Sequence, residues 1–532
     1  MSSRCNLRFL IPGLALLLGG VPSVLAVWPQ PQQIRNSAER YSLSARAFLF
    51  KHADVSAVRS GCDVLDQAFT RYFTLIFPES GGGGTGGAHN RYFWTEADPF
   101  TVEVNVAEGP CDGYPAEGSI ENYKLTVSPG QAVLTSVTVW GALRGLESLS
   151  QLVEQDDYGA YYINKTEIED FPRFQFRGLL LDTSRHYLPL QAILKTLDAM
   201  AYSKLNVFHW HIVDDPSFPY QSRKYPDLSK KGAYHPFTHI YTQTDVRRVI
   251  EHARLRGIRV LAEFDSPGHT QSWGNGQPSL LTPCYRGDVP SGTYGPVNPI
   301  LDSTYVFMAN LLKEVTSVFP DSYIHLGGDE VDFSCWKSNP DIKAFMKKMG
   351  FGSDFTKLES FYIIVNISTM LNRSSVVWQD VFDYHEINRP RYVVEVWKWG
   401  CYLCEVRRVT KAGHRVLLSA PWYINHISYG QDWRNSYTVQ PQNFSGTEEQ
   451  KKLVIGGEVC MWGEYVDATN LSPRLWPRAC AAAERLWSDE VQTSSVDQAF
   501  PRLTDFRCRL LRRGIQAEPL YVGHCKNEYQ GI

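Results

Sequence analysis

The stretch YIHLGGDEVDF, residues 323–333, runs from an apolar segment through two glycines directly into two adjacent acids, Asp329 and Glu330. Neighbouring carboxylates repel each other and lose hydration on burial, so placing them at the end of a buried strand costs free energy. We take this cost as a sign that the pair serves chemistry. The stretch therefore predicts one strand of a buried sheet that ends in a catalytic site.

Seven further apolar segments after residue 174 have the same strand character and alternate with amphipathic helices. Eight strand–helix units in roughly 300 residues predict a (β/α)8 TIM barrel, which usually takes about 250 residues plus insertions. Among the expected helices are LQAILKTLDAMAYSKL, YVFMANLLKEVTSVF and TDVRRVIEHARLRG, the last with Thr244 as its N-cap. The expected strands are FRGLLLDT, NVFHWHIVD, IRVLAEFD, YIHLGGDE, VVWQD, YVVEVW, RVLLSAPWY and LVIGGEVCMW.

The 532 residues are too many for one small core, so at least two domains are expected. Ahead of the barrel, FTVEVNV and YKLTVSPGQAVLTSVTV alternate as strands do, and WGALRGLESLSQLV has the period of a helix. We expect a small α/β domain over residues 27–174, an antiparallel sheet with helices, and the barrel over residues 175–532. The tract SGGGGTGGAHN, residues 80–90, predicts a flexible loop.

The N-terminus has the pattern of a cleavable signal peptide over residues 1–26. Arg4 and Arg8 precede a short apolar run, and Val24 and Ala26 are small residues where a signal peptidase cleaves. No later apolar stretch has the length of a membrane span. The net charge is −3 without a basic cluster, which argues against nucleic acid as a partner.

Ten of the 11 cysteines follow the signal peptide, and several should pair in an oxidising lumen. Cys401 and Cys404 form a C-x-x-C sequence that fits a redox site or half of a zinc site. Because no second C-x-x-C is present, we favour two unpaired thiols. Sequons permit N-glycosylation at Asn164, Asn366, Asn372, Asn443 and Asn470.

The active site of a TIM barrel lies at the C-terminal ends of its strands. Acids and histidines occur there together with tryptophans. Indole faces stack on sugar rings, while acids, Asn and Arg bind hydroxyl groups, so we expect a carbohydrate ligand. The residues at the strand ends are Arg185, His209, His211, Asp214, Asp215, Asp265, His269, Asp329, Glu330, Trp378, Trp397, Trp422, Tyr423, Asn425, Trp462 and Glu464.

Glycosidases with a protein nucleophile hold two carboxyl groups face to face, about 5–5.5 Å apart in retaining enzymes and about 6.5–9.5 Å apart in inverting ones. Adjacent strand residues point to opposite sides, so we do not expect Asp329 and Glu330 to face each other across a substrate. One acid then protonates the leaving group while the other binds a different group.

Several motifs resemble those of family 20 β-N-acetylhexosaminidases, most closely the α-type chains of its lysosomal members. They are H-x-G-G-D-E at residues 325–330, LLLDTSRHYLP, FHWHIVDDPSFPY, EFDSPGHT and GGEVCMWGEYVD. The similarity extends over the whole mature chain. It implies a lysosomal enzyme that removes terminal β-linked N-acetylglucosamine or N-acetylgalactosamine from glycolipids, glycosaminoglycans and glycoproteins, without a cofactor.

The resemblance also implies substrate-assisted catalysis, in which the substrate supplies the nucleophile. Glu330 is then the general acid and later the base, while the 2-acetamido oxygen attacks the anomeric carbon and forms an oxazolinium ion. Asp329 holds the acetamido N–H, and Tyr423 donates to its carbonyl oxygen. The other implied contacts are Arg185 and Glu464 on hydroxyl groups, Trp378, Trp397 and Trp462 around the acetamide and ring, and Asp214 with His269 behind Glu330. For Arg185 a buried structural ion pair is the alternative.

Two neighbouring residues depart from the family in ways that bear on substrate range. Asn425 is neutral where β-type chains carry a carboxylate, and His426 stands where α-type chains carry Arg. Asn with a protonated His would accept a 6-sulfate or a sialic acid at acidic pH. We therefore expect weak activity on anionic substrates.

Three segments also depart from the family. CYRGDVPSG, residues 284–292, differs where α-type chains dock a ganglioside activator protein, so ganglioside competence is in question. IIVNISTMLNRSS and KWGCYLCEVRRV flank Trp378 and Trp397. The resemblance implies the disulfides Cys62–Cys111, Cys284–Cys335 and Cys508–Cys525, and a homodimer or a heterodimer with a β-type subunit.

Two other functions compete with this interpretation. A metal-dependent hydrolase is suggested by His209 and His211, which point the same way on a strand, with Asp265 and His269 nearby. A sugar-binding subunit that has lost catalysis is the second, although Asp329 and Glu330 are intact.

Overall fold

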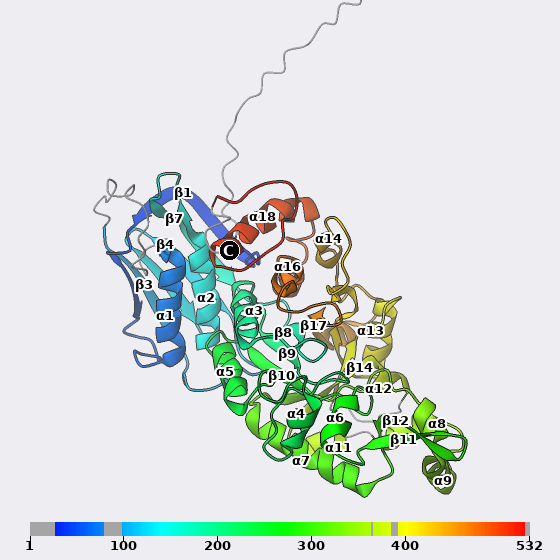
Figure 1. The fold of residues 1–532 in the computed structure, drawn as a ribbon. Coiled ribbons are helices and arrows are strands. Elements are labelled where there is room, and N and C mark those ends of the chain that lie inside the picture. Colours follow the sequence, from blue (N-terminus) through cyan, green and yellow to red (C-terminus); the bar gives the residue numbers. More distant parts are fainter. Residues whose placement is uncertain (1–26, 79–97, 363–364, 385–391, 527–532) are drawn as a thin grey trace, which may run out of the picture.

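The computed structural model describes residues 27–78, 98–362, 365–384 and 392–526. The expected signal peptide and the glycine-rich tract lie outside these ranges. Figure 1 shows a sheet-and-helix domain at the N-terminal end beside a larger barrel. Within the described ranges, no helix has the length and apolar character needed to cross a membrane.

Eight parallel strands close into a barrel in the order β10-β13-β14-β15-β16-β17-β8-β9. Each overlaps one of the eight segments predicted from the sequence, which confirms the TIM barrel; β14 begins two residues before its segment VVWQD. Their bounds are β8 (Phe176–Asp182), β9 (Val207–His211), β10 (Arg259–Glu263), β13 (Tyr323–His325), β14 (Ser374–Trp378), β15 (Tyr392–Val396), β16 (Arg415–Leu418) and β17 (Val454–Met461).

Helices surround the barrel and return the chain between parallel strands, as this topology requires. The predicted N-cap Thr244 is wrong, because α5 begins at Gln243 and Thr242 forms a capping box with Asp245. The helices are α3 (Leu190–Tyr202), α4 (Asp227–Gly232), α5 (Gln243–Arg254), α6 (Gln271–Gly276), α7 (Asp302–Val318), α8 (Ser334–Ser338), α9 (Pro340–Met349), α10 (Phe355–Tyr362), α11 (Val365–Met370), α12 (Gln379–Tyr384), α13 (Tyr402–Lys411), α14 (Trp433–Tyr437), α15 (Glu448–Lys452), α16 (Leu471–Leu475), α17 (Arg478–Trp487) and α18 (Val496–Arg512).

The N-terminal domain is a sheet in the order β1-β7-β4-β5-β3-β2, with β6 paired to β7 and two helices packed on it. The predicted antiparallel sheet is instead mixed, since β3 pairs in parallel with both β2 and β5. Helix α1 between β2 and β3 carries the chain back to the same end, which permits parallel pairing. The bounds are β1 (Gln33–Leu43), β2 (Phe48–His52), α1 (Asp63–Ile76), β3 (Phe100–Val106), β4 (Tyr123–Ser128), β5 (Gln131–Ser136), α2 (Val139–Leu152), β6 (Val153–Gln155) and β7 (Tyr161–Asp170).

Buried ion pairs join the two domains. The Glu121 carboxylate accepts hydrogen bonds from Arg144 Nε and from Arg177 Nη2 of the barrel, both at 2.7 Å. All 14 residues of α2 are buried, as expected of a helix between a sheet and a barrel. Because breaking a buried pair leaves an uncompensated charge, these contacts hold the domains in a fixed arrangement.

The barrel interior has two layers of different character. Near the N-terminal ends of the strands it is apolar, filled by Phe176, Val207, Leu261, Tyr323, Val376, Val393 and Leu417. Above this apolar layer lie buried ionisable groups, which we call the ionisable layer: His209, Glu263, His325, Glu395 and Glu458. The candidate site begins directly above it.

Four disulfides link described residues. Cys62–Cys111, Cys284–Cys335 and Cys508–Cys525 are the pairs that the resemblance implies. Cys401 and Cys404 also form a disulfide, so the preference for two unpaired thiols is wrong. Cys401 stands at the N-cap of α13 and Cys404 lies in its first turn, which brings their Cα atoms to 5.2 Å.

Candidate active site

The turn after β13 places the two acids by unusual backbone conformations. Gly327, Gly328 and Glu330 have φ angles of +66°, +98° and +51°, which L side chains rarely adopt. A Cβ on Gly327 would lie 1.7 Å from Asp265 Oδ1, so a glycine is required there. Strand β13 ends at His325, so the acids are not strand residues and the alternation assumed for them does not apply. Their directions are set by this left-handed turn.

Both acids face one imidazole. His269 Nε2 lies 3.7 Å from Asp329 Oδ2 and 3.8 Å from Glu330 Oε2. Asp329 is buried, whereas the Glu330 side chain is 59% exposed. The two carboxyl groups therefore share one neighbour but differ in exposure, so they can serve different functions.

The surroundings adjust the proton affinities of these groups. Burial, then the charge of Asp329, raises the pKa of Glu330, while His269 opposes the rise. Burial, then the charge of Asp329, raises the pKa of Asp265. Burial also raises the pKa of Asp329, against the opposing effects of His269 and of a hydrogen bond with Asp265. Burial would lower the pKa of His269, but nearby carboxylates outweigh it and raise that pKa to about 11. Glu330 is thus disposed to carry a proton beside an imidazolium, as a general acid requires.

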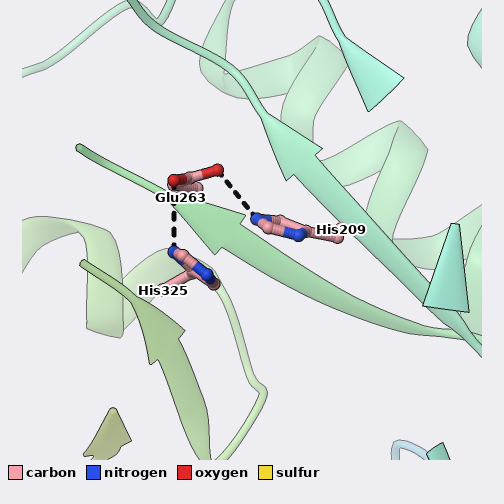
Figure 2. A group of neighbouring side chains, drawn as sticks. All are labelled: His209, Glu263 and His325. Atoms are coloured by element: carbon pink, nitrogen blue, oxygen red, sulfur yellow. Dashed lines mark ion pairs between the residues drawn. The ribbon is translucent and has the colours of Figure 1, made fainter. Parts of the chain in front are cut away.

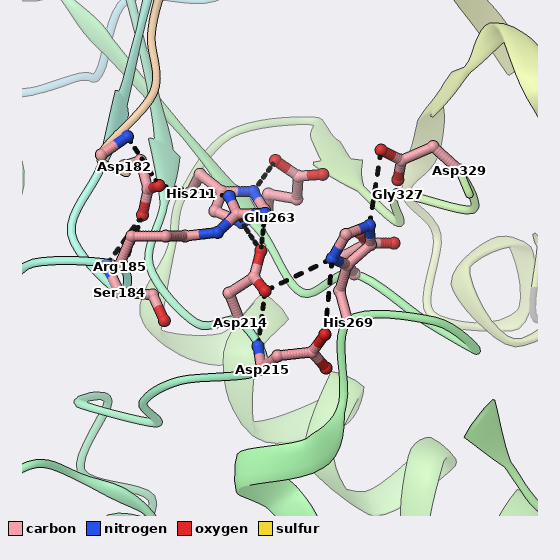
Figure 3. A network of polar contacts seen from close by, with 12 residues as sticks. Asp182, Ser184, Arg185, His211, Asp214, Asp215, Glu263, His269, Gly327 and Asp329 are labelled. Atoms are coloured by element: carbon pink, nitrogen blue, oxygen red, sulfur yellow. Dashed lines mark hydrogen bonds and ion pairs between the residues drawn. The ribbon is translucent and has the colours of Figure 1, made fainter. Parts of the chain in front are cut away.

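Two aspartates hold the Arg185 side chain in place, so it is not free at the strand end. Its Nη1 lies 3.1 Å from Asp182 Oδ2 and its Nη2 lies 2.8 Å from Asp214 Oδ2 (Figure 3). The guanidinium packs over the Trp462 ring at 5.1 Å. Asp214 also faces His269 Nδ1 at 3.3 Å. The structural ion pair considered for Arg185 is present, and it also orients the cation at the mouth of the barrel.

Aromatic side chains form the wall beside the acids. Trp378 and Trp462 have ring centroids 5.8 Å apart, and Tyr423 lies 6.2 Å from both Trp397 and Trp462. Trp397 donates from Nε1 to Asp380 Oδ2 at 2.9 Å. These four rings come from three strand ends and the turn after β16, and they offer apolar faces to a sugar ring or an acetamide methyl.

Three predicted residues lie further out on the rim. Glu464 is exposed, and its charge favours the Arg185 cation without a direct ion pair. Asn425 has a buried Oδ1 with no hydrogen-bond partner among the described residues, which leaves an acceptor for a ligand. His426 is exposed and meets Trp399 edge to face at 6.3 Å.

The metal alternative named His209 and His211 with Asp265 and His269. His269 lies with Asp265 and Asp329 in one group close enough together to hold a cation, and His209 lies with Glu263 and His325 in another (Figure 2). However, His209 Nε2 is 2.9 Å from Glu263 Oε2 and its Nδ1 is 2.6 Å from Glu458 Oε1. These carboxylates outweigh burial and raise the pKa of His209 well above its usual value. An imidazolium offers no lone pair to a metal, so we interpret this group as an ion-pair network.

The sequons differ in surroundings. Asn372 and Asn443 are exposed, while Asn164 and Asn470 are half-buried and donate from Nδ2 to backbone carbonyls. The Asn366 side chain lies outside the described part of the chain.

Sequence reasoning missed Asp182, Glu263 and Asp380. Asp182 and Asp380 lie inside the quoted segments LLLDTSRHYLP and VVWQD, and each contacts a residue of the predicted site, Arg185 or Trp397. Glu263 precedes Phe264 in the apolar strand IRVLAEFD, and an acid inside such a strand was the available signal.

Comparison with known proteins gives consistent results along the chain. The model of the glycosyl hydrolase family 20 catalytic domain matches residues 174–490, and a "beta-acetyl hexosaminidase like" model matches residues 27–152. The chain is 58% identical to "Beta-hexosaminidase subunit alpha" of Bos taurus, covering 95% of this chain and 96% of that protein. It is 52% identical to "Beta-hexosaminidase subunit beta" of Homo sapiens, covering 94% and 90%.

Among solved structures, the Flavobacterium johnsoniae chitobiase is 28% identical with a TM-score of 0.78, and the alignment covers 92% of this chain and 73% of that one. The match of the catalytic-domain model spans more than half of the 532 residues, and it includes Asp329, Glu330 and the aromatic wall. The chain belongs to glycosyl hydrolase family 20.

Proposed function

We propose that this protein is a retaining β-N-acetylhexosaminidase that removes terminal β-linked N-acetylglucosamine and N-acetylgalactosamine with help from the substrate's own acetamido group. The observation that carries this proposal is the placement of Asp329 and Glu330 on one imidazole, His269, at 3.7 and 3.8 Å. Because the two acids are neighbours on one turn and contact the same imidazole, we assign them different roles instead of acid and nucleophile on the two sides of a glycosidic bond. The nucleophile then comes from the sugar.

In this mechanism Glu330 donates its proton to the glycosidic oxygen as the acetamido oxygen attacks the anomeric carbon. Asp329 accepts the acetamido N–H and stabilises the positive charge of the oxazolinium ion, and Tyr423 donates to the attacking oxygen. Water, deprotonated by Glu330, then opens the ring with retention of configuration. The raised pKa of Glu330 supports the acid role, because a general acid must hold its proton at the working pH.

The remaining contacts follow from the walls of the site. Arg185, fixed by two aspartates, binds sugar hydroxyls together with Glu464. Trp378, Trp397 and Trp462 enclose the acetamide and the ring. At the rim, the partnerless Oδ1 of Asn425 and the exposed His426 suit a sugar with an anionic 6-substituent at acidic pH. Glycolipids, glycosaminoglycans and glycoproteins are the proposed substrate classes.

The similarity to both α and β subunits supports a dimer, either of two copies or with a β-type subunit. We propose that residues 1–26 direct the chain into the secretory pathway and to the lysosome, with domains over residues 27–174 and 175–532. The hairpin of β11 (Leu281–Arg286) and β12 (Val289–Val297) is the proposed place for a ganglioside activator protein. N-glycosylation is proposed at the five sequons.

Hydrolysis of an aryl N-acetyl-β-glucosaminide beside the matching plain β-glucoside, at about pH 4.5 near the reference pKa of glutamate, tests the mechanism. We expect cleavage of the acetamido substrate alone, and its loss in Glu330→Gln. Equal cleavage of both substrates would overturn substrate assistance. Binding of N-acetylglucosamine without turnover would support the inactive-subunit alternative.

A further inference from the structure

Glu263 is a completely buried carboxylate, and its two oxygens lie within 3.2 Å of four side-chain nitrogen atoms. It ends β10, in register with His211 on β9 and His325 on β13. Oε1 lies 2.8 Å from Trp378 Nε1 and 3.2 Å from His325 Nδ1. Oε2 lies 2.6 Å from His211 Nδ1 and 2.9 Å from His209 Nε2. Figure 2 shows Glu263 between the two imidazoles of the neighbouring strands.

We propose that Glu263 is a positioning residue that fixes two parts of the site relative to each other. One is Trp378 in the acetamide pocket, which we call the pocket arm. The other is the series His211, Asp214 and His269 that leads to Glu330, which we call the acid arm. Glu263 acts through other residues and does not touch the sugar. The proposal rests on the proposed function. It adds that one residue positions both the acetamide pocket and the surroundings of Glu330.

The first arm runs from Oε1 to Trp378. The indole is 1% exposed, and it is a wall of the aromatic cluster beside Trp462 and Tyr423. A buried indole N–H without an acceptor is costly, so the bond to Glu263 fixes the plane of this wall. The acetamide pocket therefore depends on the position of Oε1.

The second arm runs from Oε2 towards Glu330. Because His211 donates Nδ1–H to Glu263, its Nε2 faces Asp214 Oδ2 at 2.7 Å (Figure 3). Asp214 Oδ1 faces His269 Nδ1 at 3.3 Å, and His269 Nε2 faces both catalytic acids. A shift of His211 is thus passed through Asp214 to the imidazole beside Glu330.

A glutamine at position 263 could serve one arm but not both, because an amide has one oxygen where the carboxylate has two. The indole of Trp378 can only donate, whereas an imidazole can lose a proton and accept. In Glu263→Gln we therefore expect the amide oxygen to face Trp378 and the amide nitrogen to face His211. The hydrogen bond to Trp378, and with it the pocket arm, is then kept. The contact to His211, on which the acid arm depends, is altered.

The test compares phenyl and 2,4-dinitrophenyl N-acetyl-β-glucosaminides, because a poor leaving group depends on the general acid and a good one does not. For Glu263→Gln we expect kcat/KM on the phenyl glycoside to fall roughly ten- to a hundredfold, as for other residues that orient catalytic groups. The dinitrophenyl glycoside should lose only a few-fold. N-acetylglucosamine, titrated by tryptophan fluorescence, should bind about as in the wild type.

Trp378→Phe removes the pocket arm alone. It should lower kcat/KM by a similar factor on both glycosides. It should also weaken N-acetylglucosamine binding about fivefold, because a smaller ring that Glu263 no longer fixes packs less well against the sugar. Glu458→Gln is the matched control: Glu458 is equally buried and lies 2.6 Å from His209 Nδ1, but it makes no hydrogen bond to Trp378 or His211. It should leave the ratio between the glycosides and the sugar affinity unchanged.

A purely structural role for Glu263 predicts equal losses on both glycosides, in proportion to the folded fraction measured by circular dichroism. That result overturns the proposal. Should Glu263→Gln not fold, His211→Gln tests the acid arm in its place. We expect His211→Gln to lose more kcat/KM on the phenyl glycoside than on the dinitrophenyl glycoside, and Trp378→Phe to lose the same on both. The same ratio of losses in the two variants would contradict the proposal. If the wild type cleaves no acetamido substrate, the proposed function fails, while the fluorescence titration of Trp378→Phe and Glu263→Gln still tests the pocket arm.

Discussion

His269 holds its Nε2 3.8 Å from Glu330 Oε2, so the more exposed of the two acids has a cation as its neighbour. An imidazolium favours the ionised carboxylate, whereas Asp329 favours the protonated form. The two neighbours therefore pull the proton affinity of Glu330 in opposite directions, and each can be removed separately.

We predict opposite shifts of the high-pH limb of kcat/KM, where Glu330 loses its proton. His269→Phe removes the cation, so the pKa of Glu330 rises and the limb moves to higher pH. Asp329→Asn removes the repelling charge, so that pKa falls and the limb moves to lower pH. Both variants lose turnover, and Glu330→Gln should lose about a hundredfold to ten-thousandfold. Shifts in the same direction for both variants would contradict this account.

His426→Arg should improve turnover of a 6-sulfated N-acetylglucosaminide. Arg stays charged at every working pH and can bind a sulfate through two N–H groups, whereas His needs acidic pH. The measurement is kcat/KM for the sulfated and the neutral aryl substrate, with the neutral one as the control. No gain on the sulfated substrate would remove the anion role of this position.

The disulfides should differ in their contribution to stability. Cys62–Cys111 closes a sequence separation of 49 and Cys401–Cys404 one of 3. In the chain-entropy account these loops are worth about 4 and about 2 kcal/mol. Double Cys→Ala variants of each pair, compared by thermal unfolding, should lower Tm more for the first. A larger loss from Cys401–Cys404 would mean that this bridge shapes the native fold near Trp399.

Gly327→Ala should be severely destabilising, with Gly352→Ala as a matched control. Both glycines have nearly the same positive φ, +66° and +64°. An added Cβ meets Asp265 at 1.7 Å in the first and nothing within 4 Å in the second. We expect about 1 kcal/mol for Gly352→Ala and above about 4 kcal/mol for Gly327→Ala. Yields of folded protein and Tm measure the difference, and similar values for both would refute the clash.

Stability should fall from mildly acidic to alkaline pH. Burial opposes protonation of His211, but Glu263 and Asp214 outweigh it and raise its pKa to about 9 from 6.5. This stabilisation is complete below pH 6.5 and is lost towards pH 9. Burial and Glu395 raise the pKa of Glu458 to about 7 from 4.5, so its ionisation destabilises the fold over that range. Tm should therefore be higher at pH 5 than at pH 9; a flat profile would contradict these assignments.

The barrel was predictable because its strands are continuous apolar segments and each strand end shows its polar residues in order. The motifs around Asp329 and Glu330 likewise gave the family. The direction of Glu330 was not predictable, because it depends on a left-handed backbone rather than on alternation along a strand. Nor could the sequence distinguish Thr242 from Thr244 as the cap, since either threonine suits that position.

Long-range partners set a further limit on sequence reasoning. Glu263 is one acid within an apolar strand, and its meaning depends on His211, His325 and Trp378 from three other strands. The mixed N-terminal sheet depends in the same way on where α1 returns the chain. The Cys401–Cys404 bridge depends on the helix start between the two residues. Each is a property of the assembled fold rather than of a local pattern.

The apolar layer at the base of the barrel also bears on proton exchange. Phe176, Leu261 and Leu417 separate the ionisable layer from water on that side. Bulk solvent then reaches His209 and Glu263 through the mouth, where the proposed sugar site lies. A sugar bound there covers this path and slows proton exchange between the ionisable layer and bulk water. Glu330 is exposed and still meets the water that hydrolysis requires.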